Sequence, residues 1–143
     1  SVAEDYKDLH DKLKHKPEFL FEEAQCLGKT GQYMEAIQAL ERAKRLSGDP
    51  MIRYMIAKNR QAAGDYRQAE RELLRAIRIL PERLYPYYLL AKLYAEPEFY
   101  QADKLRAAAG TVLTKEPKVE TTAIREMRAE IRKILEKGAS SFF

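Results

Sequence analysis

Few side chains in this sequence have a type and spacing that could support chemistry. The chain has one cysteine, Cys26, and two histidines, His10 and His15, which stand five residues apart. This set excludes an internal disulfide and a conventional zinc site. No Ser–His–acid set, glycine-rich phosphate loop or His–Glu metal motif occurs. Cys26 stands on an apolar face beside Leu27, where a cysteine is more often a small core residue than a reactive thiol. The sequence therefore predicts a non-catalytic protein without metal or cofactor.

The composition is that of a folded and mildly basic protein of one domain's length. Of its 143 residues, 45% are hydrophobic and 34% are charged, and the formal net charge is +4. No run approaches the ~18 apolar residues of a membrane span. Acidic residues are mixed among the basic ones, so we expect no nucleic-acid partner. The first residues do not resemble a signal peptide. The absence of an initiator methionine before Ser1 suggests a piece of a longer protein, although processing or trimming of the chain would look the same.

Proline and glycine recur along the chain at a regular interval. The prolines at 17, 50, 81 and 117 are separated by 33, 31 and 36 residues, and each precedes an apolar-periodic segment. Proline costs least at a helix start, where its missing N–H is not needed. Two similar glycine turns, 31–36 and 64–69, lie 33 residues apart between these prolines. A period near 34 residues with a turn in mid-unit predicts helix–turn–helix repeats.

The residues that follow each turn resemble the tetratricopeptide repeat. The second helices carry a small–Leu–small pattern at Ala36-Leu40-Ala43 and again at Ala69-Leu73-Ala76. A third unit has the first-helix pattern Tyr87-Leu90-Ala91-Tyr94. Its turn, 96–102, lacks glycine and is one residue short, and Arg106 stands where leucine is usual. The resemblance implies antiparallel helix pairs, with an irregular third pair.

Two further amphipathic segments flank the three predicted pairs. Apolar residues share one helix face at each end of the chain, namely Val2, Tyr6, Leu9 and Leu13, and then Ile124, Met127, Ile131, Ile134 and Leu135. Stacked repeats need such terminal helices to cover their ends. We predict an all-α, right-handed superhelix in one domain over 1–143. It comprises a leading helix at 1–16, repeats at 17–49, 50–81 and 82–117, and a capping helix in segment 118–138, with Gly138 as its predicted stop.

A more specific resemblance covers residues 17 to 128. It rests on the order of the segments Pro17–Glu22, Gly48–Met51, Lys58–Ala62, Arg83–Tyr94 and Pro117–Met127. This order resembles the C-terminal repeat region of O-antigen ligase/polymerase-like membrane proteins of Gram-negative bacteria. The resemblance implies a membrane-embedded parent at the bacterial inner membrane that handles surface polysaccharide. Glycan transfer in such proteins belongs to the membrane portion, so no catalytic residue is implied here, and the side of the membrane stays open.

In tetratricopeptide arrays the first helix of each pair lines a concave groove. One predicted row comprises Phe21, Tyr54 and Tyr88, the next comprises Gln25, Lys58 and Lys92, and Met51 and Tyr85 lie at the lip. Aromatic rings offer contact area and lysines a handle for acidic groups, so a protein or peptide partner is expected. Alternatively, the same rings pack against neighbouring helices. A clamp for a terminal carboxylate is not expected, because its positions hold Phe21, Gln25, Met55, Tyr85 and Leu89.

Three arginines, Arg67, Arg71 and Arg75, follow one face of a predicted second helix. Glu70 and Glu72 lie within reach, which favours a solvated face. Contact with anionic lipid headgroups is the alternative. For the whole chain, the first hypothesis is a monomeric protein-binding scaffold. The second is a structural module that packs on its own membrane domain or self-associates without a peptide ligand. An independent enzyme has almost no support.

Overall fold

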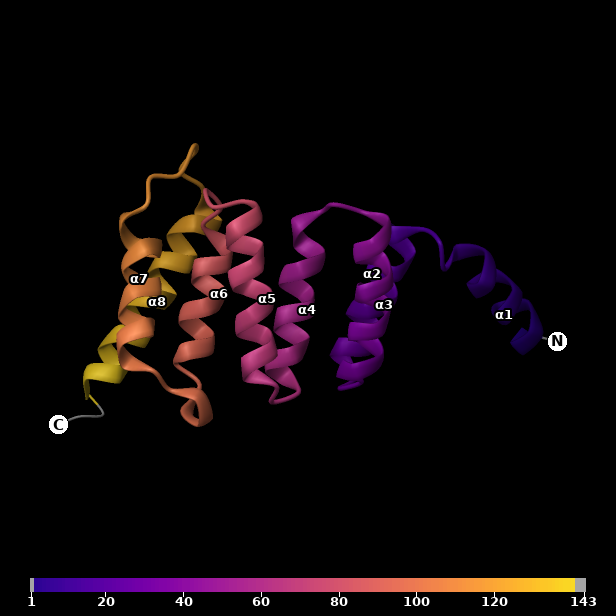
Figure 1. Ribbon diagram of the computed structural model, residues 1–143, viewed down its shortest axis with the longest axis horizontal. Helices are drawn as coiled ribbons and strands as arrows, with labels where there is room; N and C mark the ends of the chain where they lie inside the picture. The colour runs from indigo at the N-terminus through magenta and orange to yellow at the C-terminus, as the bar shows by residue number, and fades with distance from the viewer. Residues whose placement is uncertain (1, 141–143) are drawn as a thin grey trace. The chain divides into compact units, whose positions relative to one another are not determined.

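The computed structural model describes residues 2–140, which form eight α-helices and one short 3-10 helix (Figure 1). None of these residues forms a strand. The order of the helices confirms the predicted all-α fold, with one leading helix, three pairs and one trailing helix. Their bounds are α1 Val2–Leu13, α2 Pro17–Lys29, α3 Tyr33–Leu46, α4 Pro50–Ala62, α5 Tyr66–Ile79, α6 Tyr85–Tyr94, η1 Pro97–Phe99, α7 Ala102–Thr114 and α8 Thr122–Ser140.

The chain divides into two compact units, residues 1–69 and 70–143, and the division falls within α5. In the first unit α3 packs against both α2 and α4. In the second unit α6, α7 and α8 pack together, as Figure 1 shows. No helix within residues 2–140 combines the length and the hydropathy that crossing a bilayer requires.

The two glycine turns of the first unit have the same backbone geometry. Gly31 has φ +80° and Gly64 has φ +83°, values that residues with a side chain rarely adopt. In each turn the N–H after the glycine donates to the carbonyl four residues before the glycine, at 2.9 Å and 2.8 Å. This is the Schellman arrangement, which satisfies carbonyls at the end of a helix. The predicted turn similarity is therefore confirmed in the backbone.

The core of the first unit is built from the small–Leu–small pattern. Ala36, Leu40 and Ala43 of α3 are fully buried.

Helices α2 and α4 approach each other closely at Gly28. A Cβ added at Gly28 would lie 3.0 Å from Asn59 Oδ1. Asn59 is itself buried, and its Nδ2 donates to the Met55 carbonyl at 2.8 Å. The absence of a side chain at position 28 therefore allows the two first helices to approach closely.

The third pair keeps a buried helix face, although its turn differs. The glycine turn is replaced by η1, Pro97–Phe99. The buried residues of α7 are Leu105, Ala108, Ala109 and Val112. Arg106 is exposed and forms an ion pair with Asp103. In the repeat pattern a leucine is usual at the position of Arg106. Here the buried leucine is the preceding residue, Leu105.

The trailing helix α8 packs on α6 and α7, as predicted for a cap. Ile131 is fully buried. Arg128 holds the end of α7, since its Nε donates to the Val112 carbonyl at 3.0 Å and its Nη2 to the Lys115 carbonyl at 2.6 Å. The predicted helix stop at Gly138 is wrong. The helix continues to Ser140, and a Cβ on Gly138 would lie 3.4 Å from the Tyr100 hydroxyl.

The periodic prolines occupy two kinds of position. Pro17 and Pro50 stand in the first turns of α2 and α4, as predicted. Pro81 and Pro117 instead lie in the connections before α6 and α8. The proline in the first turn of α6 is Pro86. The four prolines thus recur with the period of the repeat, but only two of them lie in the first turn of a helix.

The leading helix α1 leaves much of its predicted apolar face in solvent. Val2 is 86% exposed and Leu9 is 53% exposed, while the side chain of Tyr6 lies outside the described ones. The contacts of α1 with α2 include an edge-to-face pair of His10 with Phe19. His10 Nε2 also lies 3.1 Å from Glu23 Oε2. The amphipathic pattern correctly predicted a helix, but the expectation that it covers the end of the repeats is wrong for Val2 and Leu9.

Candidate interaction surface

The residues predicted to line a groove include several that are accessible. Gln25 on α2 and Met51 and Lys58 on α4 are exposed within the first unit. Phe21 is partly exposed in the same unit, and Tyr85 and Lys92 of α6 are partly exposed in the second. Gln25, Met51 and Lys58 therefore present the most exposed side-chain surface of the predicted set.

Two rings of the predicted groove are buried. Tyr54 is 4% exposed and Tyr88 is 9% exposed. Such rings offer little surface to a ligand, so for both of them the burial agrees with the alternative that they pack inside the protein. A repeat pattern cannot distinguish these two possibilities, because an aromatic ring on a first helix suits a groove and a helix interface equally well.

Tyr88 and Lys92 share a carboxylate that the sequence analysis did not single out. Lys92 Nζ lies 3.1 Å from Glu130 Oε1 of α8, and the Tyr88 hydroxyl donates to the other oxygen of the same carboxylate. Lys92 Nζ also lies 5.1 Å from the centre of the Tyr88 ring. Helix α8 therefore brings an acidic group of the chain itself to the predicted groove positions of the third repeat.

This arrangement shifts the pKa of each group. The hydrogen bond from Tyr88, followed by that from Lys92, outweighs burial and lowers the pKa of Glu130. Burial, together with the hydrogen bond to Glu130, raises the pKa of Tyr88. For Lys92, burial alone would lower the pKa, but the hydrogen bond to Glu130 and the nearby charges raise it. The directions describe an ionised carboxylate that binds a neutral tyrosine and a charged lysine.

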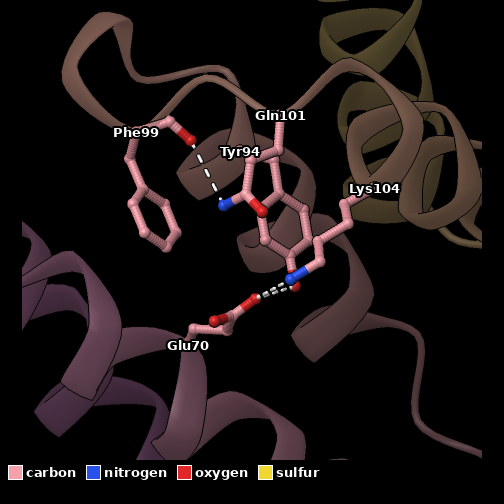
Figure 2. A network of polar contacts seen from close by, with 5 residues as sticks. All are labelled: Glu70, Tyr94, Phe99, Gln101 and Lys104. Atoms are coloured by element: carbon pink, nitrogen blue, oxygen red, sulfur yellow. Dashed lines mark hydrogen bonds and ion pairs between the residues drawn. The ribbon is translucent and has the colours of Figure 1, made fainter.

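A second network of the same composition lies at Glu70, in the second unit (Figure 2). The Tyr94 hydroxyl donates to Glu70 Oε2 at 2.6 Å, and Lys104 Nζ donates to the same oxygen at 3.1 Å. Beside it, Gln101 Nε2 donates to the Phe99 carbonyl at 3.4 Å. Burial and the hydrogen bond to Glu70 raise the pKa of Tyr94. This network joins the second part of α5 to α6 and α7.

The two networks hold helices together. In each, one carboxylate accepts from a buried tyrosine and from a lysine whose ammonium lies over the ring of that tyrosine, at 5.1 Å and 5.6 Å. Both tyrosine pKa values are raised, which keeps the phenols neutral. A tyrosine that acts as a general base or nucleophile would need a lowered pKa. Each network therefore has the chemistry of a structural tie.

The first unit also contains a pocket of about 200 Å³. It lies between the first turns of α2 and α4 and the connection that precedes α4, and Phe21 is the one predicted groove residue that lines it. Three carboxylates not considered in the sequence analysis also line it, and the full set is Pro17, Glu18, Phe21, Glu22, Ser47, Asp49 and Ile52. The pocket thus combines apolar walls with an acidic rim.

Comparison with known proteins supports the repeat assignment. Residues 6–76 match the family model of the anaphase-promoting complex, cyclosome, subunit 3, which is a tetratricopeptide-like repeat. The chain has a tetratricopeptide-like fold. No curated protein matched the sequence.

Within this tetratricopeptide-like fold, the chemically reactive side chains have ordinary surroundings. Cys26 is exposed on α2, so the prediction that it is a small core residue is wrong. The apolar face of α2 contains the buried Leu20 and Ala24 instead. His10 contacts Glu23, and no group of three His, Cys, Asp or Glu residues within the described part of the chain could hold a metal ion.

The arginines of α5 are each exposed, namely Arg67, Arg71 and Arg75. The carboxylate of Glu70, which we expected to relieve their repulsion, binds Tyr94 and Lys104. The exposure is compatible with a solvated face and with lipid contact, and both remain predictions.

Proposed function

We propose that this protein is a non-catalytic scaffold that binds a protein or peptide partner. Repeat arrays of the tetratricopeptide type offer their first helices for binding. The observation that carries the proposal is the exposure of Gln25, Met51 and Lys58 on the first helices of two successive repeats within one unit. These side chains combine hydrogen bonding, a flexible apolar surface and a positive charge, which suits an extended peptide with apolar and acidic residues.

A direct test is a binding assay on the intact chain with charge reversal at the proposed face. We expect Lys58→Glu to weaken capture of the partner that the wild-type protein retains. Arg42→Glu is a matched control, because Arg42 is an exposed basic residue of α3, outside the proposed face. Equal capture by both variants and the wild type would show that this face does not bind.

We further propose that the chain is the tail of a membrane-embedded parent that handles O-antigen or another surface polysaccharide at the bacterial inner membrane. The support is the ordered resemblance of residues 17 to 128 to such tails. On this proposal the chain itself is monomeric, and glycan transfer resides in the parent. An antibody raised against the chain should detect a longer protein in inner-membrane fractions, and its recovery only in the soluble fraction would refute this part.

A specific observation favours the second candidate, a structural module without a peptide ligand. Glu130 of α8 already pairs with Lys92 and Tyr88, so the acidic group that the third repeat is suited to bind comes from the same chain. The binding assay with Lys58→Glu distinguishes the two candidates. A structural module would capture no partner whose binding is weakened by this substitution. Sedimentation of the intact chain then distinguishes self-association from a monomer.

A further inference from the structure

The pocket of the first unit has the walls of a site for a long side chain. Pro17, Phe21 and Ile52 supply apolar surface, and Glu18, Glu22 and Asp49 supply carboxylates. Asp49 caps α4, since its Oδ1 accepts from the Met51 N–H at 3.0 Å. Glu18 and Glu22, one turn apart on α2, are exposed, and Phe21 beside them is partly exposed.

The repeat itself does not require these two glutamates. One repeat later, the positions equivalent to Glu18 and Glu22 hold Met51 and Met55, and in the third repeat they hold Tyr85 and Leu89. The position of Phe21 is aromatic in all three repeats, with Tyr54 in the second and Tyr88 in the third. A glutamate in the first turn of a helix favours the helix dipole, which accounts for Glu18, but Glu22 lies beyond that turn. The acidic rim is thus particular to the first repeat.

We propose that this pocket binds an arginine side chain of the partner. The inference rests on the proposed scaffold function and deepens it by naming the chemistry of one contact. The aliphatic stem of arginine packs on apolar surface while its charged head remains at the rim. Its planar guanidinium can stack on the Phe21 ring and donate to two carboxylates, which the compact lysine ammonium does less well. The carboxylates of the pocket favour this positively charged arginine. The acidic residues of the partner would instead bind near Lys58.

The test selects peptides from a random library on three forms of the intact chain. These are the wild type, a Glu18→Gln/Glu22→Gln variant, and a Glu35→Gln/Glu126→Gln control. The control loses the same charge at exposed positions of α3 and α8. We expect arginine to be enriched among peptides selected by the wild type and the control, and not by the pocket variant. Replacing that arginine by citrulline, its neutral isostere, should weaken binding at least about tenfold, or ~1.4 kcal/mol.

Each other outcome has a definite meaning. Peptides that bind equally well with citrulline, or equally well to the pocket variant, overturn the arginine inference while leaving the scaffold function intact. Enrichment of lysine as often as arginine refutes the guanidinium as the recognised group. Failure of all three forms to select any peptide overturns the scaffold function and the inference together. Amide shifts of 15N-labelled protein on titration must fall at Phe21 and Ile52, and shifts confined to the second unit contradict the proposal.

Discussion

The ammonium of Lys92 on α6 lies 3.1 Å from the carboxylate of Glu130 on α8. The same carboxylate accepts from the Tyr88 hydroxyl. Two side chains of α6 thus share the carboxylate of one residue of α8, and one of the two, Tyr88, is buried. The contribution of the terminal helix to stability therefore depends on the charge of Glu130.

This dependence predicts a pH effect. The pKa of Glu130 in the folded protein lies below its ordinary value of 4.5. The ionised carboxylate therefore stabilises the fold above the pKa of the unfolded chain, and this contribution is lost as the pH falls through the lower, folded pKa. We expect the difference in unfolding free energy between the wild type and Glu130→Gln to narrow as the pH falls below 4.5. Urea unfolding across a pH series measures it. For Glu126→Gln, an exposed position on the same helix, the difference should change less.

The buried ring of Tyr54 predicts a large loss of stability on truncation. Tyr54→Ala should lower the free energy of unfolding by about 3–5 kcal/mol, the range for removal of a large buried side chain. Lys58→Ala, one turn further along α4 and exposed, should change it by less than about 0.5 kcal/mol. Chemical denaturation of the two variants gives the comparison. A small effect of Tyr54→Ala would restore this ring as a groove residue.

The close approach at Gly28 predicts opposite effects of two glycine substitutions. Gly28→Ala places a methyl group 3.0 Å from Asn59 Oδ1, and Asn59 is held by its bond to the Met55 carbonyl. We expect a loss of about 1–3 kcal/mol from overpacking. Gly110→Ala adds a methyl group inside α7 with nothing within 4 Å. It should stabilise by about 0.4–1 kcal/mol. Equal effects of the two substitutions on the melting temperature would contradict the packing described for Gly28.

The burial of Ile131 predicts that α8 stabilises the second unit. Ile131→Ala should cost about 2–5 kcal/mol, because the side chain is fully buried where α8 packs. Ala129→Ser, at an exposed position two residues earlier, should leave the thermal melt nearly unchanged. Circular dichroism follows both melts. An unchanged melt for Ile131→Ala would show that α8 does not act as a cap.

The sequence predicted those features that depend on local chemistry. The turns at Gly31 and Gly64 require a backbone conformation that glycine adopts readily, so the repeated residues were sufficient evidence. The burial of Ala36, Leu40 and Ala43 on α3 followed from their spacing.

Other features depend on three-dimensional context. Leu105 is buried and Arg106 is exposed, because the face of α7 that packs against its neighbours differs by one residue from the face that the repeat spacing predicted. The exposure of Cys26 depends on which side of α2 meets its neighbours. Glu130 and the pocket carboxylates were missed because their importance arises from side chains that are distant in sequence. A pattern search sees an acidic residue on a helix, and only the packing reveals its partners.

Arg128 attaches α8 to the end of α7 by binding main-chain oxygens, at Val112 and Lys115. Every amino acid offers the same carbonyl, so these two hydrogen bonds do not depend on which side chains stand at positions 112 and 115, although Arg128 also pairs with the Glu120 carboxylate at 3.5 Å. Homologous chains could therefore vary freely at position 115 and still seat their terminal helix. The insertion or loss of one residue between 112 and 115 would move one oxygen out of reach, so the attachment tolerates changes of residue type and constrains changes of length.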